Sequence, residues 1–151
     1  ANNRRCGVGV AYDVKIAGIR LTSTDLPSDT KAAKAFYPFP GHQIDIFSNS
    51  WGPPDTGYTV AGPGPLTQLA LQTGLMKGRG GRGSIYVRSA GNGAIFGDNG
   101  ALDGFVNNIY SIPVAAVNKD GIPSHASESC CYDICLFFKS GDNVNCEQYC
   151  L

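Results

Sequence analysis

Residues 44–55 read Ile-Asp-Ile-Phe-Ser-Asn-Ser-Trp-Gly-Pro-Pro-Asp, and this stretch decides how the rest of the chain is interpreted. It opens with a short apolar run typical of a buried strand in a parallel sheet, and it continues into a loop of small residues and prolines. Residues 84–93, Ser-Ile-Tyr-Val-Arg-Ser-Ala-Gly-Asn-Gly, repeat the pattern about forty residues later. Loops that leave strand ends carry the sites of α/β proteins, and small residues let the backbone approach a ligand closely. We therefore predict that the two loops lie side by side and form a site.

Composition favours a buried globular domain. The 151 residues are 42% hydrophobic and 16% charged, and twelve basic side chains balance twelve acidic ones. Such a balance provides no overall field toward nucleic acid or a membrane surface, so neither is an expected partner. The apolar runs are too short to span a bilayer. The chain begins at Ala1 rather than Met, which leads us to expect an internal piece of a longer protein.

The order of the predicted elements indicates an α/β fold. Apolar patterning, capping residues and turn residues predict two helices, one from Asp29 to Phe36 and one from Pro65 to the glycine run at 78–83. The same patterning predicts four strands, at 15–21, 43–47, 84–88 and 109–116. Helical spacing predicts one buried stripe on the second helix, formed by Leu66, Leu69, Ala70, Thr73 and Met76. Strands alternating with helices are typical of a three-layer arrangement.

The glycine run at 78–83, Gly-Arg-Gly-Gly-Arg-Gly, matches two functional patterns. It fits the G-x-G-x-x-G spacing of dinucleotide sites, but it follows a helix and precedes a strand, the reverse of what phosphate binding at a helix N-terminus requires. One arginine–glycine segment in a chain of zero net charge is also weak support for nucleic-acid binding. A helix end followed by a connecting loop is the favoured interpretation.

Cysteines and histidines suggest no catalytic or metal site by themselves. Five of the six cysteines lie within residues 130–150 with no spacing typical of zinc ligands, and six cysteines can form three disulfides in fifteen ways. His42 and His125 are the only histidines, and neither lies near a nucleophile motif such as G-x-S-x-G. Both are expected to be exposed loop residues.

Four carboxylates fall in loops beside the two key strands. They are Asp55, Asp98, Asp103 and Glu128. Acids gathered in a partly buried site need a cation, which can be a metal ion or a basic ligand. Ordinary capping of loops by aspartate explains the same residues equally well, so the pattern leaves both interpretations open.

Longer matches point to one family. Residues 6–12, Cys-Gly-Val-Gly-Val-Ala-Tyr, together with 45–53 and 80–87, resemble the catalytic domain of the proprotein convertases. These are the furin and kexin branch of the subtilisin-like serine proteases, peptidase S8. The resemblance implies a three-layer, mainly parallel α/β subtilisin-like fold that is incomplete in this chain. It predicts a partial catalytic domain over 1–141, and it leaves 142–151 as an unrelated or misread tail.

The resemblance also implies roles for individual residues. Asn92 would be the oxyanion-hole amide that stabilises the tetrahedral intermediate of peptide cleavage. Asp55 and Asp103 would select an arginine before the scissile bond, because two carboxylates pair selectively with a guanidinium. The complete implied substrate-binding set is Ser50, Trp51, Gly52, Pro53, Asp55, Ala90, Gly91 and Asp103.

Calcium is the cofactor that the resemblance implies. Asp55, Asp98 and Glu128 would hold one ion with hard oxygen ligands from separate loops. Asn3 and the carbonyl groups of Arg5 and Gly7 would supply part of a second site.

The chain departs from the family pattern at several points, and the predicted function takes these departures into account. In the family the catalytic Asp and His precede the point where this chain begins, and the Ser lies in a later Gly-Thr-Ser motif that does not occur here. Ala32 and Ala61 replace acids that read a more distant arginine, and Phe105 replaces a tyrosine. The prediction is therefore a fragment of a calcium-dependent endopeptidase that cleaves proproteins after arginine in the secretory pathway, Golgi membrane-bound or secreted, and that is inactive alone. The alternative is a non-catalytic truncated relative that binds calcium or basic peptides.

Overall fold

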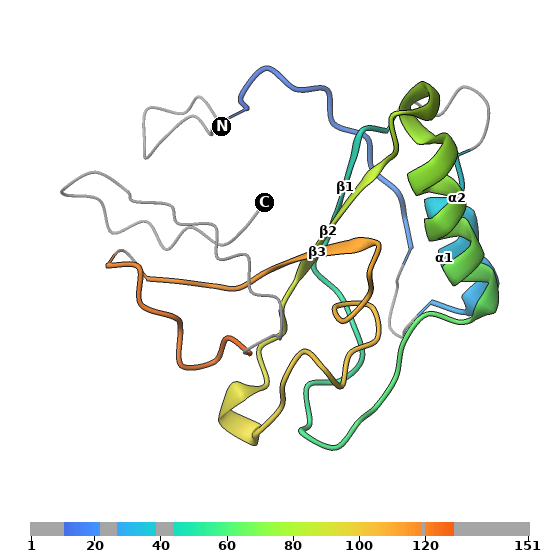
Figure 1. Cartoon of the computed structure of the whole chain (residues 1–151). Helices are drawn as coiled ribbons and strands as arrows, with labels where there is room; N and C mark the ends of the chain where they lie inside the picture. The colour runs from blue at the N-terminus through green and yellow to red at the C-terminus, as the bar shows by residue number, and fades with distance from the viewer. Residues whose placement is uncertain (1–10, 22–26, 39–43, 119, 129–151) are drawn as a thin grey trace.

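The computed structural model describes residues 11–21, 27–38, 44–118 and 120–128. Figure 1 shows the chain, with two helices on one side of a small sheet. In chain order the elements are α1 (Asp29–Phe36), β1 (Ile46–Asn49), α2 (Pro65–Gly81), β2 (Ile85–Ser89), the short 3₁₀ helix η1 (Ala94–Phe96) and β3 (Ser111–Val114).

The three strands form one parallel sheet in the order β1-β2-β3. Phe47 pairs with Tyr86 across β1 and β2, and Val87 pairs with Ile112 across β2 and β3. Parallel strands end at the same edge of a sheet, so the loops that follow β1 and β2 leave side by side. The fold thus places the two predicted loops together.

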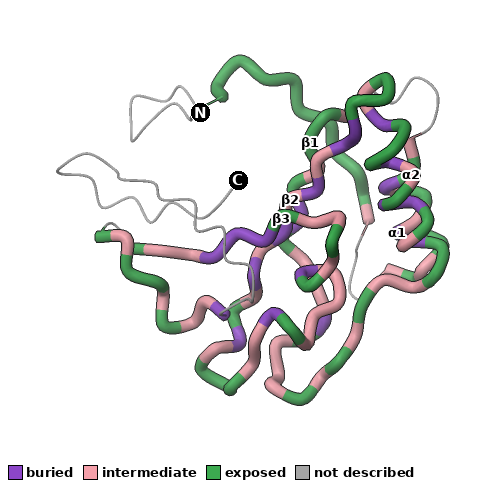
Figure 2. Tube along the Cα trace, viewed as in Figure 1, coloured by how far each residue is buried: buried purple, intermediate pink, exposed green. Residues whose placement is uncertain are grey.

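A compact core joins the helices to the sheet. Ala32 and Phe36 of α1 pack with Leu71 of α2 and Tyr86 of β2, and all four are at most 3% exposed. The ring of Phe36 meets that of Tyr86 edge-on, with centroids 5.5 Å apart, and the Tyr86 hydroxyl donates to the Phe36 carbonyl at 3.2 Å. Figure 2 shows buried residues along the strands and on the inner faces of the helices. This core holds the sheet at a fixed distance from both helices.

The predicted buried stripe of α2 is wrong for its large residues. Leu66, Leu69 and Met76 are 50%, 58% and 65% exposed. The face that packs inward is instead Thr67, Ala70, Leu71, Gly74 and Gly78. A Cβ at Gly74 would collide with the Tyr86 hydroxyl, so α2 approaches β2 through residues that lack bulk. Close approach of helix and strand, rather than apolar spacing, decides which face is buried.

The glycine run ends α2 as predicted. The backbone leaves helical geometry at Gly78, and Arg79 adopts the left-handed conformation with φ 53°. The Gly83 N–H then donates to the Gly78 carbonyl at 2.9 Å. Arg79 Nε forms an ion pair with Asp45 at 2.8 Å, which fastens this loop to the start of β1.

The predicted strand at 15–21 is wrong. Residues 14–20 form no strand and are exposed along their whole length. A strand is stabilised by pairing with a neighbour, and none of the described residues pairs with this segment. The other strands form close to their predicted positions, and α1 spans the residues that the sequence predicts.

The α/β class with a parallel sheet is confirmed. The described residues supply the sheet and one helical layer, which together are part of the predicted three-layer arrangement. Among the described residues, no helix combines the length and the apolar character needed to cross a bilayer.

Candidate functional site

The loops after β1 and β2 are joined directly. The backbone N–H of Asn92 donates to Asp55 Oδ2 at 2.9 Å. On the far side of β2, the Ala90 N–H donates to the Val114 carbonyl at 2.9 Å and continues the ladder with β3. Hydrogen bonds thus hold the second loop in place from both sides.

The first loop is supported by aromatic packing. The Trp51 ring stacks on Phe36 with centroids 6.3 Å apart and meets Phe105 edge-on at 5.2 Å. Its carbonyl accepts a hydrogen bond of 2.6 Å from Arg88 Nη2. Ser50 and Gly52, on either side, are exposed and partly exposed. The backbone of this loop is therefore held rigidly by the tryptophan while its neighbours face outward.

Asp103 lies beneath Gly52. A Cβ at position 52 would come within 2.7 Å of Asp103 Oδ2, so the backbone of this loop passes close to that carboxylate. The other oxygen, Oδ1, accepts the N–H groups of Phe105 at 2.7 Å and Val106 at 3.4 Å. Burial raises the pKa of Asp103, while the Phe105 N–H and the charge of Arg88 oppose that rise. Oδ1 thus holds the backbone of Phe105 and Val106, while Oδ2 faces the loop that contains Gly52.

The second loop has a buried base and an exposed tip. Ala90 is 2% exposed, whereas Asn92 is exposed and its side-chain amide makes no hydrogen bond within the part of the chain that the structure describes. Gly91 has φ 108°, and a side chain there would overlap the Glu128 carboxylate. The amide of Asn92 is therefore available to a ligand, and the loop beneath it is fixed by close packing.

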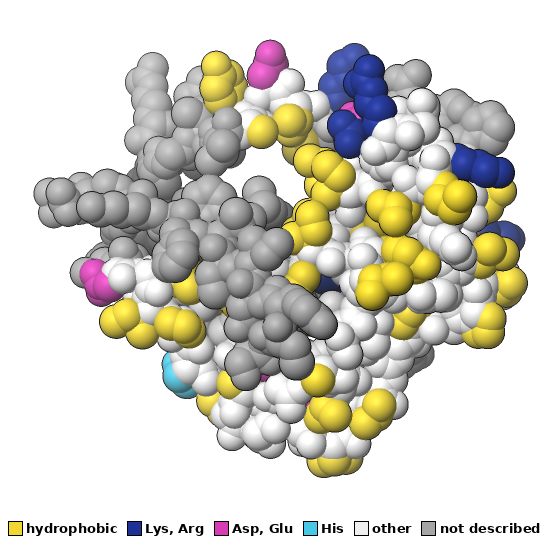
Figure 3. All heavy atoms as spheres, viewed as in Figure 1, with side chains coloured by type: hydrophobic (Ala, Val, Ile, Leu, Met, Phe, Trp, Pro, Cys, Tyr) yellow, Lys and Arg dark blue, Asp and Glu magenta, His cyan; other side chains and the backbone are white. Residues whose placement is uncertain are grey.

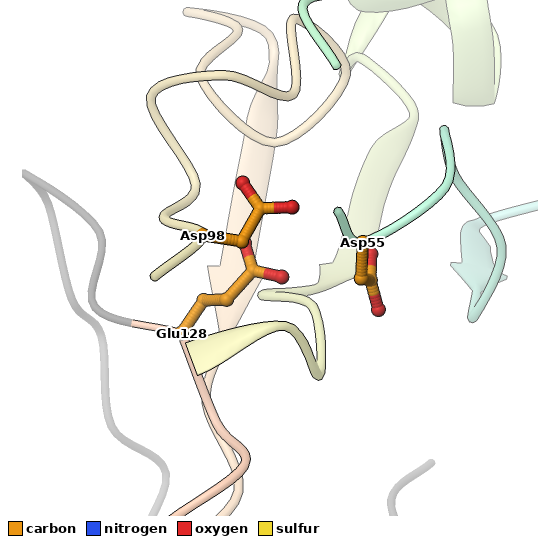
Figure 4. A group of neighbouring side chains, drawn as sticks. All are labelled: Asp55, Asp98 and Glu128. Carbon is orange, nitrogen blue, oxygen red and sulfur yellow. The ribbon is translucent and has the colours of Figure 1, made fainter. Parts of the chain in front are cut away.

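Three of the predicted acids come together. Asp55, Asp98 and Glu128 each offer a carboxylate oxygen, and these oxygens lie within 4.8 Å of one another. Figure 4 shows Asp98 and Glu128 beside each other, with Asp55 facing them from a separate loop. Gly93 lies between them, because its Cβ would meet Asp98 Cβ at 2.6 Å and Asp55 Cβ at 2.8 Å.

The cluster is electrostatically unbalanced. Glu128 is 3% exposed, and its Oε1 accepts the Gly93 N–H at 2.8 Å. Burial raises its pKa, and the charges of Asp98 and Asp55 raise it further against that hydrogen bond. In the described residues no basic side chain forms an ion pair with these acids. Three hard oxygen donors with no counter-charge fit a calcium ion.

Arg88 is a residue of the site that sequence reasoning missed. It lies on β2 and is only 3% exposed, with its guanidinium 4.4 Å from the Trp51 ring and 4.8 Å from the Phe105 ring. Burial lowers its pKa to about 10, and Asp103 counteracts this. The one signal in the sequence that pointed to Arg88 is the presence of an arginine within an otherwise apolar strand.

Other predicted positions fall into two groups. Ala32 is 1% exposed in the core, and Ala61 forms a bridge with Asp103. His125 is exposed. Several residues for which predictions were made lie outside the described part of the chain: Asn3, Arg5 and Gly7 of the second calcium site, His42, all six cysteines and the tail at 142–151.

Comparison with known proteins identifies the family. The pattern of the Subtilase family, peptidase S8, matches residues 1–145. The chain is 44% identical over 140 residues to the dibasic-processing endoprotease of Yarrowia lipolytica, and the aligned region covers 92% of this chain and 14% of that protein. It is 43% identical over 141 residues to human proprotein convertase subtilisin/kexin type 6, and this region covers 93% of this chain and 14% of the human protein. It is 41% identical over 140 residues to kexin of Saccharomyces cerevisiae, and this region covers 92% of this chain and 17% of kexin.

The chain thus spans 14–17% of the length of these three relatives. The match over most of this chain, the parallel sheet and the two neighbouring loops agree with one another. The chain belongs to the subtilase family and is similar to its proprotein convertases and kexins.

Proposed function

We propose that this chain is the central part of the catalytic domain of a calcium-dependent serine endopeptidase that cleaves proproteins after arginine. The observation that carries the proposal is the direct link between Asn92 and Asp55, which joins a loop with an exposed amide to a loop with an acid cluster. In this proposal residues 1–141 belong to the catalytic domain and 142–151 form an unrelated tail. The complete protein works in the secretory pathway.

Asn92 supplies the oxyanion donor in this proposal. Its side chain is exposed at the tip of a loop whose base is fixed by Ala90 and Gly91. A fixed N–H donor aimed at a developing negative charge lowers the barrier because it needs no reorganisation during the reaction. Loss of such a donor costs about 10²–10³ in rate, a magnitude measured in subtilisin itself.

Asp55 and Asp103 select the arginine side chain. Two carboxylates at the base of a slot between the two loops match the planar, always charged guanidinium. The backbone of Ser50, Trp51, Gly52 and Pro53 forms one wall, and Ala90 and Gly91 form the other. Extended peptide backbone added along such a wall is bound as an extra strand.

Calcium is held by Asp55, Asp98 and Glu128, and it neutralises the cluster and fixes the loops on which the slot depends. Asn3 and the carbonyl groups of Arg5 and Gly7 contribute to a second site in the same proposal. No chemical step passes through either ion.

The 151-residue chain by itself is expected to be inactive, because it contains no Gly-Thr-Ser motif and neither histidine belongs to a triad pattern. The test offers the purified chain a fluorogenic peptide with arginine before the cleaved bond, with calcium present. Turnover that a serine-directed inhibitor abolishes would show this expectation to be wrong.

A second candidate function is non-catalytic binding of calcium or basic peptides by the same chain. The observation that favours it is the assembled acid cluster in a chain without the triad motif. Calorimetric titration with calcium addresses the cluster directly: saturable binding that Glu128→Gln removes supports a cation site. Absence of binding in a folded chain would contradict the proposed calcium role in both candidates.

A further inference from the structure

Arg88 is a buried cation whose hydrogen-bonding capacity is mostly unused. The residue is 3% exposed, and its Nη2 donates to the Trp51 carbonyl at 2.6 Å. Its Nε and Nη1 are buried and have no hydrogen-bond partner within the described residues. A buried charge without a full set of partners is costly, so it persists only where surrounding groups offset the cost.

The groups that offset this cost belong to the slot. The guanidinium lies 4.4 Å from the Trp51 ring and 4.8 Å from the Phe105 ring, within the range of cation–π attraction. Asp103 attracts it electrostatically. Phe36, Leu71 and Phe105 line a small space that Arg88 also borders. The groups that contact or attract the guanidinium thus belong to the first loop and to the segment that contains Asp103 and Phe105.

Gly52 locates this charge relative to the slot. A Cβ at that position would be 2.7 Å from Asp103 Oδ2 and 4.0 Å from Arg88 Nη2. The carboxylate and the guanidinium thus converge under the same point of the first loop. A ligand guanidinium that approached Asp103 there would meet the like charge of Arg88 behind it.

We infer that Arg88 is a specificity-determining residue of the slot, an internal cation that offsets Asp103 and so weakens selection for a guanidinium. The inference rests on the proposed function, because it concerns the same slot. Asp55 then provides most of the attraction for a basic side chain. Repulsion between two like charges in a medium of effective dielectric near 20 is enough to change affinity about tenfold.

The test measures binding of two small probes to the full 151-residue chain by NMR titration, with calcium present and at a pH well below the pKa of Arg88, so that its charge is kept. One probe is Nα-acetylarginine methylamide and the other is the uncharged Nα-acetylnorleucine methylamide. Arg88→Met and Arg88→Gln should each bind the arginine probe about tenfold more tightly than the wild type, with no change for the norleucine probe. Gln keeps a donor for the Trp51 carbonyl, so agreement of the two variants separates charge from hydrogen bonding.

A control keeps the result interpretable. Arg82→Met removes an exposed arginine and should change nothing. Unchanged or weaker arginine binding by both neutral variants, with wild-type binding present, would overturn the inference alone. Absence of arginine binding in every variant, each shown to be folded by circular dichroism, would overturn the proposed slot as well.

Discussion

Gly93 shows at the scale of one residue how closely the acid cluster is packed. Its N–H donates to Glu128, while a Cβ on it would collide with both Asp55 and Asp98. The three acids therefore surround a position that only glycine can occupy. Glu128 is the buried member of the cluster, and the effect of its charge on stability can be tested by a single substitution.

Glu128→Gln is expected to stabilise the calcium-free chain at neutral pH. Glutamine keeps a carbonyl oxygen for the Gly93 N–H but removes a charge that burial and two neighbouring acids disfavour. The melting temperature should rise by about 2–4 °C, which corresponds to about 1 kcal/mol for a chain of this size. Added calcium should raise the melting temperature of the wild type and leave that of the variant unchanged.

The pH dependence of this effect has a definite sign. Because the folded-state pKa of Glu128 is raised, the folded chain binds a proton more tightly than the unfolded chain. The contribution of Glu128 to the free energy of unfolding is then greatest below its unfolded pKa of about 4.3, and it falls as pH rises through the folded pKa. Melting curves of wild type and Glu128→Gln should diverge across that window. The exposed Asp13→Asn variant is the control, and an equal change in it would count against this explanation.

At the scale of elements, the start of α2 depends on a residue of α1. Gly64, the N-cap of α2, provides no side-chain acceptor. Asp29 accepts the Leu66 N–H at 3.0 Å and the Thr67 N–H at 2.8 Å instead. A carboxylate at a helix N-terminus satisfies free N–H groups and complements the helix dipole. One aspartate thus caps a helix that begins 36 residues later, from Asp29 to Pro65.

Asp29→Ala should lower the melting temperature by several degrees at neutral pH. The Thr67 side chain lowers the pKa of Asp29 most, and the N–H groups of Leu66 and Thr67 lower it further, while burial opposes them. The stabilisation is therefore present above the unfolded pKa of about 3.9 and is lost as pH falls through the folded pKa. Thermal melts should show the difference from wild type shrinking in acid. A difference that grows in acid would contradict the capping role.

The contact between α2 and β2 makes a second prediction at this scale. Gly74→Ala should destabilise the chain, although alanine favours a helix by about 1 kcal/mol, because the added methyl group overlaps the Tyr86 hydroxyl. Overpacking of a core costs about 1–3 kcal/mol. Chemical denaturation measures the loss.

Tyr86→Phe removes the hydroxyl and relieves this overlap. In the Tyr86→Phe background, Gly74→Ala should therefore be neutral or stabilising. An equal loss in both backgrounds would mean that the two residues do not interact.

Local signals in the sequence predict most of these elements but not their packing. Ser28 and the residues after it suffice to predict α1, and Pro65 marks the start of α2, because capping and backbone restriction act within a few residues. The buried face of α2 could not be predicted, since it depends on Tyr86 approaching Gly74 from another element.

The site shows the same division between local and distant causes. The sequence placed Asp55, Asp98 and Glu128 in loops, and the structure brings them together. Arg88 was missed because its burial depends on Trp51 and Phe105, which are far from it in the sequence.

At the scale of the whole molecule, many large apolar side chains of the described residues are exposed. Figure 3 shows hydrophobic side chains gathered on the side where α2 lies. Leu66, Leu69 and Met76 lie three and seven residues apart, so they share one face of the helix, and each is at least 50% exposed. Ile46 of β1 is 58% exposed as well. Large apolar patches of this kind are typical of contact surfaces.

We therefore expect the isolated chain to self-associate through the outer face of α2. Leu69→Lys combined with Met76→Lys should shift sedimentation toward the monomer while changing stability by less than about 1 kcal/mol, because both side chains already face outward. Leu71→Ala on the opposite face is the matched control, since Leu71 is 3% exposed and its loss should cost about 2–5 kcal/mol without reducing association. If the double lysine variant unfolded while Leu71→Ala remained stable, the assignment of the two faces of α2 would be reversed.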